Sequence, residues 1–265
     1  MLKSRLLLER QVNTVARKKI VFVIVEGPSD DEALGVLLEK VFNSSTVFVY
    51  ITHGDITSKP GTDPSRILAV VGDLVKGYAK SNHLNNTHFQ EIIHITDTDG
   101  AFIPDESVVE DPSATKAQYT LTEIRTANVE GILIRNALKS QCLNRLSGAQ
   151  KIWGIPYQAY YMSCNLDHVL HDEQNSSDEE KEKNALAFAK RYRQDVDGFI
   201  KFIAESDFSV TSNYVESWNY IKQGVHSLER HTNLGLCLTS ATEVDSESDA
   251  PRWIKRLNNQ VINRI

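Results

Sequence analysis

Hydrophobic and polar positions along the chain follow two periods, which predict strands and helices in alternation. Val21–Val25 is a continuous apolar run, as in a strand buried on both faces, and the residues after it space their apolar side chains for a helix. The elements expected in residues 18–100 are strands at 21–25, 47–51 and 91–95, a helix at 30–42, and a helix that Asp63 or Ser65 caps and that continues to Lys80. We therefore expect an α/β fold with a mostly parallel sheet covered by helices.

The rest of the chain is less regular. Residues 101–130 are polar and contain proline, so we expect an excursion from the sheet there. The other expected elements are a short amphipathic helix at 2–15, a helix at 131–146, a strand at 151–162, a charged loop or helix start at 172–183, and helices at 184–205, 213–230 and 251–262. These elements divide the chain into an N-terminal helix at 1–17, an α/β core at 18–170 and a mostly helical C-terminal region at 171–265.

The composition is that of an ordinary globular protein, with 24% charged and 41% apolar residues among 265. A net charge of −6 argues against indiscriminate binding of nucleic acid, although it leaves room for a local basic face beside an acidic centre. No apolar run approaches the roughly 20 residues that span a bilayer, so we expect a cytoplasmic protein with no membrane partner. The three cysteines lack the close pairing of a disulfide framework or a zinc site.

Two strand ends carry acidic residues that a buried strand does not need. Glu26 follows the first strand, and Asp97 and Asp99 end the third, with Gly100 allowing the backbone to turn away. If these strands are neighbours in a parallel sheet, Glu26 lies at the same edge as the aspartate pair, whose side chains would share one face by strand alternation. Three converging carboxylates repel one another unless a divalent cation neutralises them, and oxygen ligands favour Mg²⁺ or Mn²⁺.

The order of these residues resembles that of a known family. An apolar strand followed by Glu26-Gly27, then Asp30 opening a helix, and later Asp97-x-Asp99-Gly100 closing another strand is similar to the Toprim domain of topoisomerases, primases, a maturation ribonuclease and the overcoming-lysogenization-defect nucleases. The resemblance covers roughly residues 18–100. It implies a Toprim-type, Rossmann-like fold, a role for Glu26 in acid/base chemistry or metal binding, and magnesium held by Asp97 and Asp99. Asp30 matches a further acidic position of the nuclease branch.

The resemblance also implies a biological setting. Chain length and cysteine count disfavour the topoisomerase, primase and recombination-mediator branches. The segment Tyr160–His168 is similar to the strand-to-helix corner by which small stand-alone Toprim nucleases of phage-defence and abortive-infection systems present another acid, here Asp167. Asp30 and Asp167 would then form a second metal site. The resemblance implies a toxic effector that an ABC-type ATPase partner controls and that cleaves transfer RNA, other RNA or DNA after infection. Whether the chain forms a homodimer is left open.

Each acidic residue also has a purely structural interpretation. Glu26 could favour the amino end of the following helix through its dipole, and Asp30 could cap that helix. The Asp97-x-Asp99-Gly100 segment could start a turn, and Asn165 could cap the helix that would carry Asp167.

A second candidate surface lies in the helix expected at 213–230. Trp218, Lys222, His226 and Arg230 recur at intervals of four and would share one face of it. Lys222, His226 and Arg230 are weak candidates for contacting the phosphates of a nucleic acid. The alternative is a half-exposed helix that packs through Trp218 and uses Arg230 for an ion pair.

Two rival functions remain open at this stage. A haloacid-dehalogenase-like phosphatase also ends a strand with Asp-x-Asp-Gly, and Asp97 would then be its nucleophile. Against it, the motif is followed by Ala101 in place of the usual threonine, and a complete strand-helix-strand unit precedes it. The other rival is a non-catalytic regulatory or partner-binding module with an acidic pocket.

Overall fold

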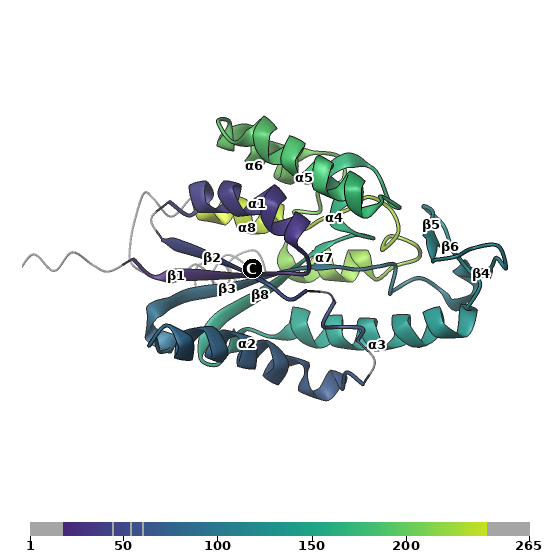
Figure 1. Ribbon diagram of the computed structural model, residues 1–265, viewed down its shortest axis with the longest axis horizontal. Coiled ribbons are helices and arrows are strands. Elements are labelled where there is room, and N and C mark those ends of the chain that lie inside the picture. Colours follow the sequence, from purple (N-terminus) through teal and green to yellow (C-terminus); the bar gives the residue numbers. More distant parts are fainter. Residues whose placement is uncertain (1–17, 44, 54, 60, 243–265) are drawn as a thin grey trace, which may run out of the picture.

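The computed structural model describes residues 18–43, 45–53, 55–59 and 61–242; the helices expected at 2–15 and 251–262 lie outside these residues. The centre of the fold is a five-stranded sheet in the order β2-β1-β3-β8-β7 (Figure 1). Strands β2, β1, β3 and β8 are parallel, whereas the two-residue β7 pairs antiparallel with β8. The strands are β1 (Ile20–Val25), β2 (Thr46–Ile51), β3 (Phe89–Asp97), β7 (Lys151–Ile152) and β8 (Ile155–Met162).

Helices cover both faces of this sheet (Figure 1). Short 3-10 turns lie at Pro64–Arg66, Asn86–His88 and Asp105–Ser107. The α-helices are α1 (Pro28–Val41), α2 (Ile67–Ser81), α3 (Val129–Gly148), α4 (Leu166–His171), α5 (Asp178–Tyr192), α6 (Val196–Glu205), α7 (Tyr214–Ile221) and α8 (Gly235–Thr242).

Two hydrophobic cores hold these layers together, one on each face of the sheet. Along β1 the side chains alternate between them: Val21, Val23 and Val25 enter one core, and Phe22 and Ile24 enter the other. The first core also contains apolar residues of α1, α4, α5, α6 and α8, and the second contains residues of α2, α3 and α7. The helices after α4 therefore share the core of the α/β part.

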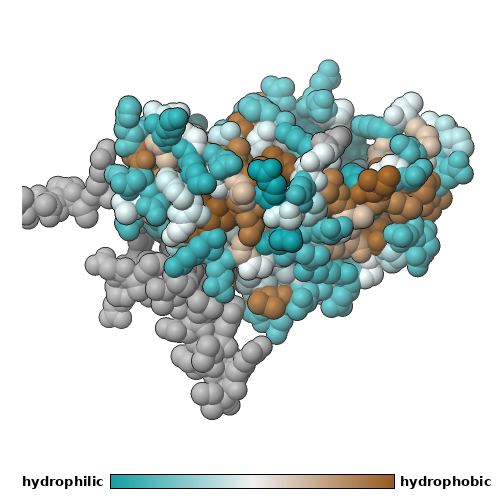
Figure 2. All heavy atoms as spheres, turned by 90° about the horizontal axis from the view of Figure 1, so that it is seen from below, coloured by the Kyte–Doolittle hydropathy of each residue, from teal (hydrophilic) through white to brown (hydrophobic). Residues whose placement is uncertain are grey.

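The excursion after β3 forms a second sheet of three short strands in the order β4-β6-β5. These strands are β4 (Val108–Glu110), β5 (Gln118–Tyr119) and β6 (Ile124–Thr126). Seen from the side of α2 and α3, the surface is largely hydrophilic, and apolar side chains gather over the end of α3 nearest this small sheet (Figure 2). Val109, Leu121 and Ile134 are exposed in this part of the chain. No helix in the described residues combines the length and apolar character needed to cross a bilayer.

The α/β class and mostly parallel sheet predicted from the sequence are confirmed, but three expected elements are divided. The strand expected at 151–162 is split by a turn at Trp153 and Gly154, both with positive φ. The helix expected at 184–205 is wrong as a single element, because α5 ends at Tyr192 and Asp195 caps α6 by accepting the N–H of Gly198 at 2.9 Å.

The prediction of one helix over residues 213–230 is also wrong beyond the first half of that range. Helix α7 ends at Ile221, and the chain turns through Gly224, whose φ of 51° is a left-handed conformation that suits glycine. His226 then stabilises the end of α7, since its Nδ1 lies 2.8 Å from the carbonyl oxygen of Tyr220. A periodicity of four was therefore not evidence of one continuous helix face.

Candidate functional site

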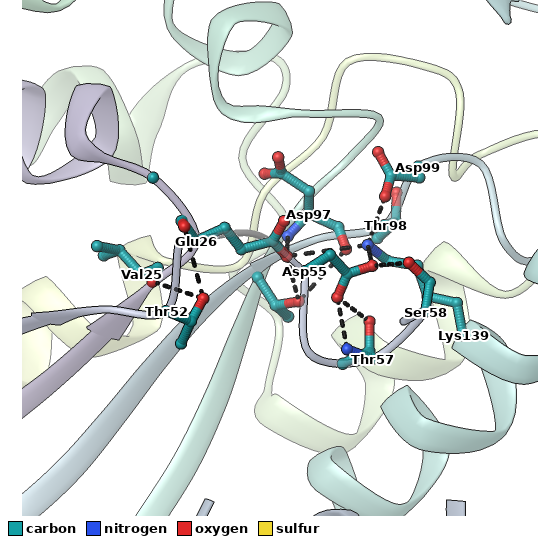
Figure 3. Close-up of polar contacts among 12 residues, drawn as sticks. Val25, Glu26, Thr52, Asp55, Thr57, Ser58, Asp97, Thr98, Asp99 and Lys139 are labelled. Carbon is teal, nitrogen blue, oxygen red and sulfur yellow. Dashed lines mark hydrogen bonds and ion pairs between the residues drawn. The ribbon is translucent and has the colours of Figure 1, made fainter. Parts of the chain in front are cut away.

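Glu26 and Asp97 meet at the carboxyl ends of two neighbouring strands, β1 and β3 (Figure 3). Oε1 of Glu26 accepts hydrogen bonds from the N–H of Asp97 and from the hydroxyl of Thr96, both at 3.2 Å. The chain goes from β1 out to the edge strand β2 and returns past β1 to β3, so the strand order reverses between β1 and β3. This edge is therefore the topological switch point at which open α/β sheets bind their ligands.

Lys139 of α3 lies among three of the acids (Figure 3). Its ammonium nitrogen is 2.5 Å from Oδ2 of Asp99, 2.7 Å from Oδ2 of Asp55 and 3.8 Å from Oε1 of Glu26, and its side chain is 0% exposed. Burial disfavours the charged amine, but the surrounding carboxylates, Asp99 foremost, raise the pKa of Lys139 well above its usual value. We call Lys139, Glu26, Asp55 and Asp99 the Lys139 group.

Asp55 is the most firmly held acid of the Lys139 group. Its carboxylate accepts the N–H of Thr57 at 2.6 Å, the hydroxyls of Thr57 and Ser58, and the ammonium of Lys139. Burial acts to raise the pKa of Asp55, but Lys139 and these hydrogen bonds outweigh it and lower the pKa below its usual value. Asp55 therefore fixes the position of the Lys139 ammonium.

Asp99 is positioned by a backbone turn after β3, not by the alternation of side chains along the strand. Strand β3 ends at Asp97, and Asp99 has a φ of 47°, followed by Gly100 at 66°. Arg135 holds this turn by donating from Nη2 to the carbonyl oxygen of Asp99 at 2.8 Å. The expectation that Asp97 and Asp99 share a strand face is wrong, because the left-handed turn directs Asp99 toward Lys139.

Asp97 faces a different environment, which it shares with Asp30 and Asp167. These three acids line one small cavity of about 30 Å³, together with Asn165, His171 and Lys181. No donor in the described part of the chain forms a hydrogen bond with the Asp97 carboxylate. Burial, followed by the charges of Glu26 and Asp30, raises the pKa of Asp97 well above its usual value. We call Asp97, Asp30 and Asp167 the Asp97 group.

Helix α1 begins at Pro28 with Gly27 as its N-cap, so Asp30 is not the capping residue itself but the third helical residue, whose side chain closes a capping box. Its Oδ2 accepts the N–H of Gly27 at 2.9 Å and the N–H of Glu26 at 3.1 Å. Burial nevertheless raises the pKa of Asp30, against the lowering effect of these two bonds. Both capping bonds use Oδ2, and Asp30 also lines the cavity that Asp97 lines.

Asp167 lies in the first turn of α4, and Asn165 caps this helix by accepting the N–H of His168 at 2.9 Å. The Asp167 carboxylate accepts a hydrogen bond from Asn184 at 3.3 Å, and burial raises its pKa. The structure therefore brings Asp167 to the same cavity as Asp30 and Asp97, 137 and 70 residues away along the chain.

Glu26 belongs to the Lys139 group but also lies next to Asp97 of the Asp97 group. Burial raises the pKa of Glu26 to about 8, although Lys139 acts in the opposite direction. Its Oε1 is occupied by two hydrogen bonds, and no donor in the described residues bonds to Oε2. Glu26 is therefore fixed in orientation with one oxygen left for a ligand.

The weak nucleic-acid candidates do not form one surface. Arg230 donates from Nε and Nη2 to the carbonyl oxygen of Val169 at 3.0 and 2.8 Å and lies over the ring of Phe208. Lys222 lies near the ring of Trp218, and His226 stacks on Tyr220. Because α7 ends before Lys222, the shared helix face expected for these residues is wrong, and their contacts stabilise the loop after α7.

Asp55 and Lys139 are the site residues that the sequence interpretation missed. Asp55 follows the second strand as Glu26 follows the first, so the same strand-end argument applied to it would have found it. Lys139 is a lone lysine on the apolar side of its helix, near Cys142 and Leu143, with Arg135 one turn before it. A buried lysine needs an anionic partner, and that need was a usable signal.

The donor chemistry of the site fits a hard divalent cation. Its ligands are oxygens, and the cavity of about 30 Å³ is large enough for an ion or about two water molecules. Carboxyl groups also outnumber cationic side chains: the Lys139 and Asp97 groups together contain six carboxyl groups, and three cationic side chains lie beside them, Arg135, Lys139 and Lys181. The described residues contain no ready-made group of three His, Cys, Asp or Glu ligands around one ion position.

Comparisons of the chain with protein-family models, with curated proteins and with solved structures gave no match. The function of the site is therefore inferred from its own residues.

Proposed function

We propose that this chain is a Toprim-type nuclease that uses Mg²⁺ or Mn²⁺ to hydrolyse phosphodiester bonds in RNA or DNA. The observation that supports it best is the meeting of Glu26 and Asp97 at the switch point, with further acids beside them and too few cations to balance them. The proposal is also supported by the parallel pairing of β1 with β3, which brings Glu26 to the edge where Asp97 lies.

In this proposal Asp97 is the principal metal ligand, and Asp30, Asp99 and Glu26 are the further candidates, with Asp167 at the far side of the cavity. A bound divalent cation would polarise a phosphate oxygen and lower the pKa of the attacking water. Glu26 contributes a carboxylate oxygen, Oε2, in a fixed orientation, either to the ion or to accept a proton from that water. Asp55 and Lys139 position Glu26 and Asp99 and limit their mutual repulsion.

The substrate and biological setting follow from the resemblance alone. They are cleavage of transfer RNA, other RNA or DNA as the toxic effector of an anti-phage defence system, under the control of an ABC-type ATPase. The test is co-purification of the chain with an ATPase encoded beside it, followed by sequencing of RNA ends after phage infection. New ends in transfer RNA would identify transfer RNA as the substrate. Unchanged RNA together with fragmented DNA would identify DNA as the substrate instead.

The catalytic proposal is tested by incubating the protein with mixed nucleic acids and Mn²⁺. Glu26→Gln and Asp97→Asn should each lower the cleavage rate by at least about a hundred-fold, since even outer-shell partners of a metal cost 10–100-fold. Asp73→Asn is the matched control, because Asp73 lies on the exposed side of α2 and its ion pair in the described residues is with Lys76. Wild-type cleavage by either site variant, with both folded, rules the assignment out.

The same protein preparation separates the two rivals. A phosphatase that uses Asp97 as nucleophile would be trapped by beryllofluoride and would release phosphate from small esters without cutting nucleic acid. A non-catalytic module would cut nothing, and its Glu26→Gln variant would bind its partner as the wild type does. Metal-dependent cleavage without a phosphoenzyme excludes both.

A further inference from the structure

Within the described residues, strand β2 is an edge of the main sheet that no other strand covers. It lies at one end of the strand order, and its sequence, Thr46–Ile51, contains no charged residue, proline or glycine. Its side chains are partly exposed, whereas those of Val21–Val25 in the neighbouring β1 are 0–1% exposed. Proteins usually protect such edges with charges, prolines or bulges, because an uncharged edge strand pairs readily with another strand.

The outward backbone groups of β2 can be assigned from its pairing with β1. The N–H groups of Thr46 and Thr52 donate to the carbonyl oxygens of Lys19 and Val25, at 2.9 and 3.0 Å. Because donors alternate sides along a strand, the N–H and C=O groups of Val47, Val49 and Ile51 point away from β1. No described strand pairs with them.

A groove of about 1040 Å³ runs beside this edge, between β2, α1 and α5. Val36 and Leu186 are exposed apolar residues in its walls, 42% and 51% accessible. The groove also carries both signs of charge: Asp31, Glu32 and Glu39 on α1, Lys190 on α5, and Arg193 directly after α5. A surface that binds its own copy needs both signs, since the acids of one copy then face the bases of the other.

We propose that β2 is a dimerisation strand, which pairs antiparallel with β2 of a second copy about a two-fold axis at Val49. In this register Val49 faces Val49 of the other copy, and Val47 faces Ile51. All three outward residues then form hydrogen-bonded antiparallel pairs with the other copy. Each of their outward N–H and C=O groups has a hydrogen-bond partner in this register. The paired side chains fall on the face toward α1, where Val47, Val49 and Ile51 already pack against the first core.

The two edge strands of the main sheet indicate that the partner of β2 is a second copy of this chain. The other edge strand, β7, has two residues, so a head-to-tail contact between β2 and β7 would leave most of β2 unpaired. Among the described strands, only β2 against β2 satisfies the whole strand, and a contact of one patch with itself closes as a dimer. The strands would run in opposite directions, which places the two acidic sites at opposite ends of a joined sheet. This inference does not depend on the proposed nuclease function.

Cross-linking tests both the pairing and its register. The native cysteines Cys142, Cys164 and Cys237 are buried, so an introduced surface cysteine reports its own environment. Cα atoms of a hydrogen-bonded antiparallel pair are about 5.5 Å apart, which a disulfide can bridge. Val49→Cys should therefore form a covalent dimer under mild oxidation. Val47→Cys is the matched control and should stay uncross-linked, because its partner in this register is Ile51.

Sedimentation equilibrium of the full chain supplies the independent measurement. Wild type should show a concentration-dependent dimer, and Val49→Pro should be monomeric with an unchanged circular dichroism spectrum, since only an outward N–H is removed. If Val49→Pro does not fold, Val36→Glu in the exposed wall of the groove should weaken the dimer instead. A wild type that remains monomeric at all concentrations, or equal cross-linking by Val47→Cys and Val49→Cys, overturns the proposal.

Discussion

The Lys139 group and the Asp97 group contain the same kind of side chain in opposite electrostatic conditions. Asp55 in the first is surrounded by donors and an ammonium, and its pKa is lowered. Asp97 in the second has like charges beside it and no donor among the described residues, and its pKa is raised. A carboxylate with its counter-ion built in stabilises the fold, whereas one without it is available to an external cation.

This comparison separates residues that hold the site together from residues that can bind a ligand. Lys139 supplies the internal cation for Glu26, Asp55 and Asp99. The cavity lined by the Asp97 group is where added positive charge would gain most, because three acids line it and its basic residues are Lys181 and His171, whose pKa burial lowers. The variants below test that division in order of expected effect.

Lys139→Met should have the largest effect. It leaves three carboxyl groups at a buried position without their cation, so the free energy of unfolding should fall by about 3–5 kcal/mol. Urea denaturation at neutral pH measures this change. Lys76→Met, at an exposed ion pair with Asp73, should change it little. A small loss for Lys139→Met would mean that the Lys139 group is not balanced internally.

His94 should make the protein sensitive to acid beside the same group. Its side chain is 2% exposed, Nδ1 lies 2.9 Å from the Tyr157 hydroxyl, and burial lowers its pKa to about 4, with Asp55 opposing and Lys139 adding to the shift. Between pH 6.5 and 4 the unfolded chain binds a proton that the folded chain does not. The free energy of unfolding should therefore fall as the pH falls through this window, by at most about 3 kcal/mol.

Denaturation at a series of pH values measures this dependence in wild type and in His94→Gln. The variant should lose that part of the slope, while the part that comes from His168, whose pKa burial also lowers to about 4, should remain. His83→Asn is the control, because His83 is exposed and its positive φ suits asparagine. An unchanged slope in His94→Gln contradicts the assignment.

Asp97→Asn and Asp55→Asn should change stability in opposite directions. In the presence of a chelator, removing the Asp97 charge relieves repulsion and should raise the free energy of unfolding by about 1–2 kcal/mol. Removing the Asp55 charge weakens its bond to Lys139 and should lower it by about 2 kcal/mol. Thermal and urea denaturation measure the sign of the change in the free energy of unfolding for each variant. Equal signs for the two variants would erase the distinction between the groups.

Tyr119→Phe should have the smallest effect. Its hydroxyl accepts a hydrogen bond from Nη1 of Arg135 at 2.5 Å, and Arg135 in turn holds the carbonyl oxygen of Asp99. We expect a loss of about 1 kcal/mol in the free energy of unfolding. Tyr78→Phe is the control, since the Tyr78 side chain packs on Phe48 as a ring. A loss no larger than that of the control would show that the small sheet does not support the site.

The strand and helix order of residues 18–100 was predictable because each element buries one continuous pattern. The continuous apolar run of β1 fills two cores by alternation, so the run itself predicted a strand buried on both faces. The division of 184–205 and 213–230 was not predictable in this way. There a capping aspartate, Asp195, and a left-handed glycine, Gly224, interrupt spacing that still looks helical.

The acids at strand ends were predictable for the same local reason, and their partners were not. Glu26 and Asp97 stand where an apolar strand ends, which is visible in the sequence. Lys139 lies 113 residues after Glu26 on a helix whose apolar side gave no indication of what faced it. Asp99 came to Lys139 through a backbone turn that the strand period could not anticipate.

The sequence by itself determined the order of strands and helices in residues 18–100 and that acids gather at one rim of a parallel sheet. The tertiary structure decided how that acidity is divided: Lys139 balances Glu26, Asp55 and Asp99, and Asp97 is left with Asp30 and Asp167 around a cavity. The physical reason is that periodicity follows from contacts between neighbours in the chain. The charge state of a buried carboxyl depends instead on donors and cations that distant segments bring to it.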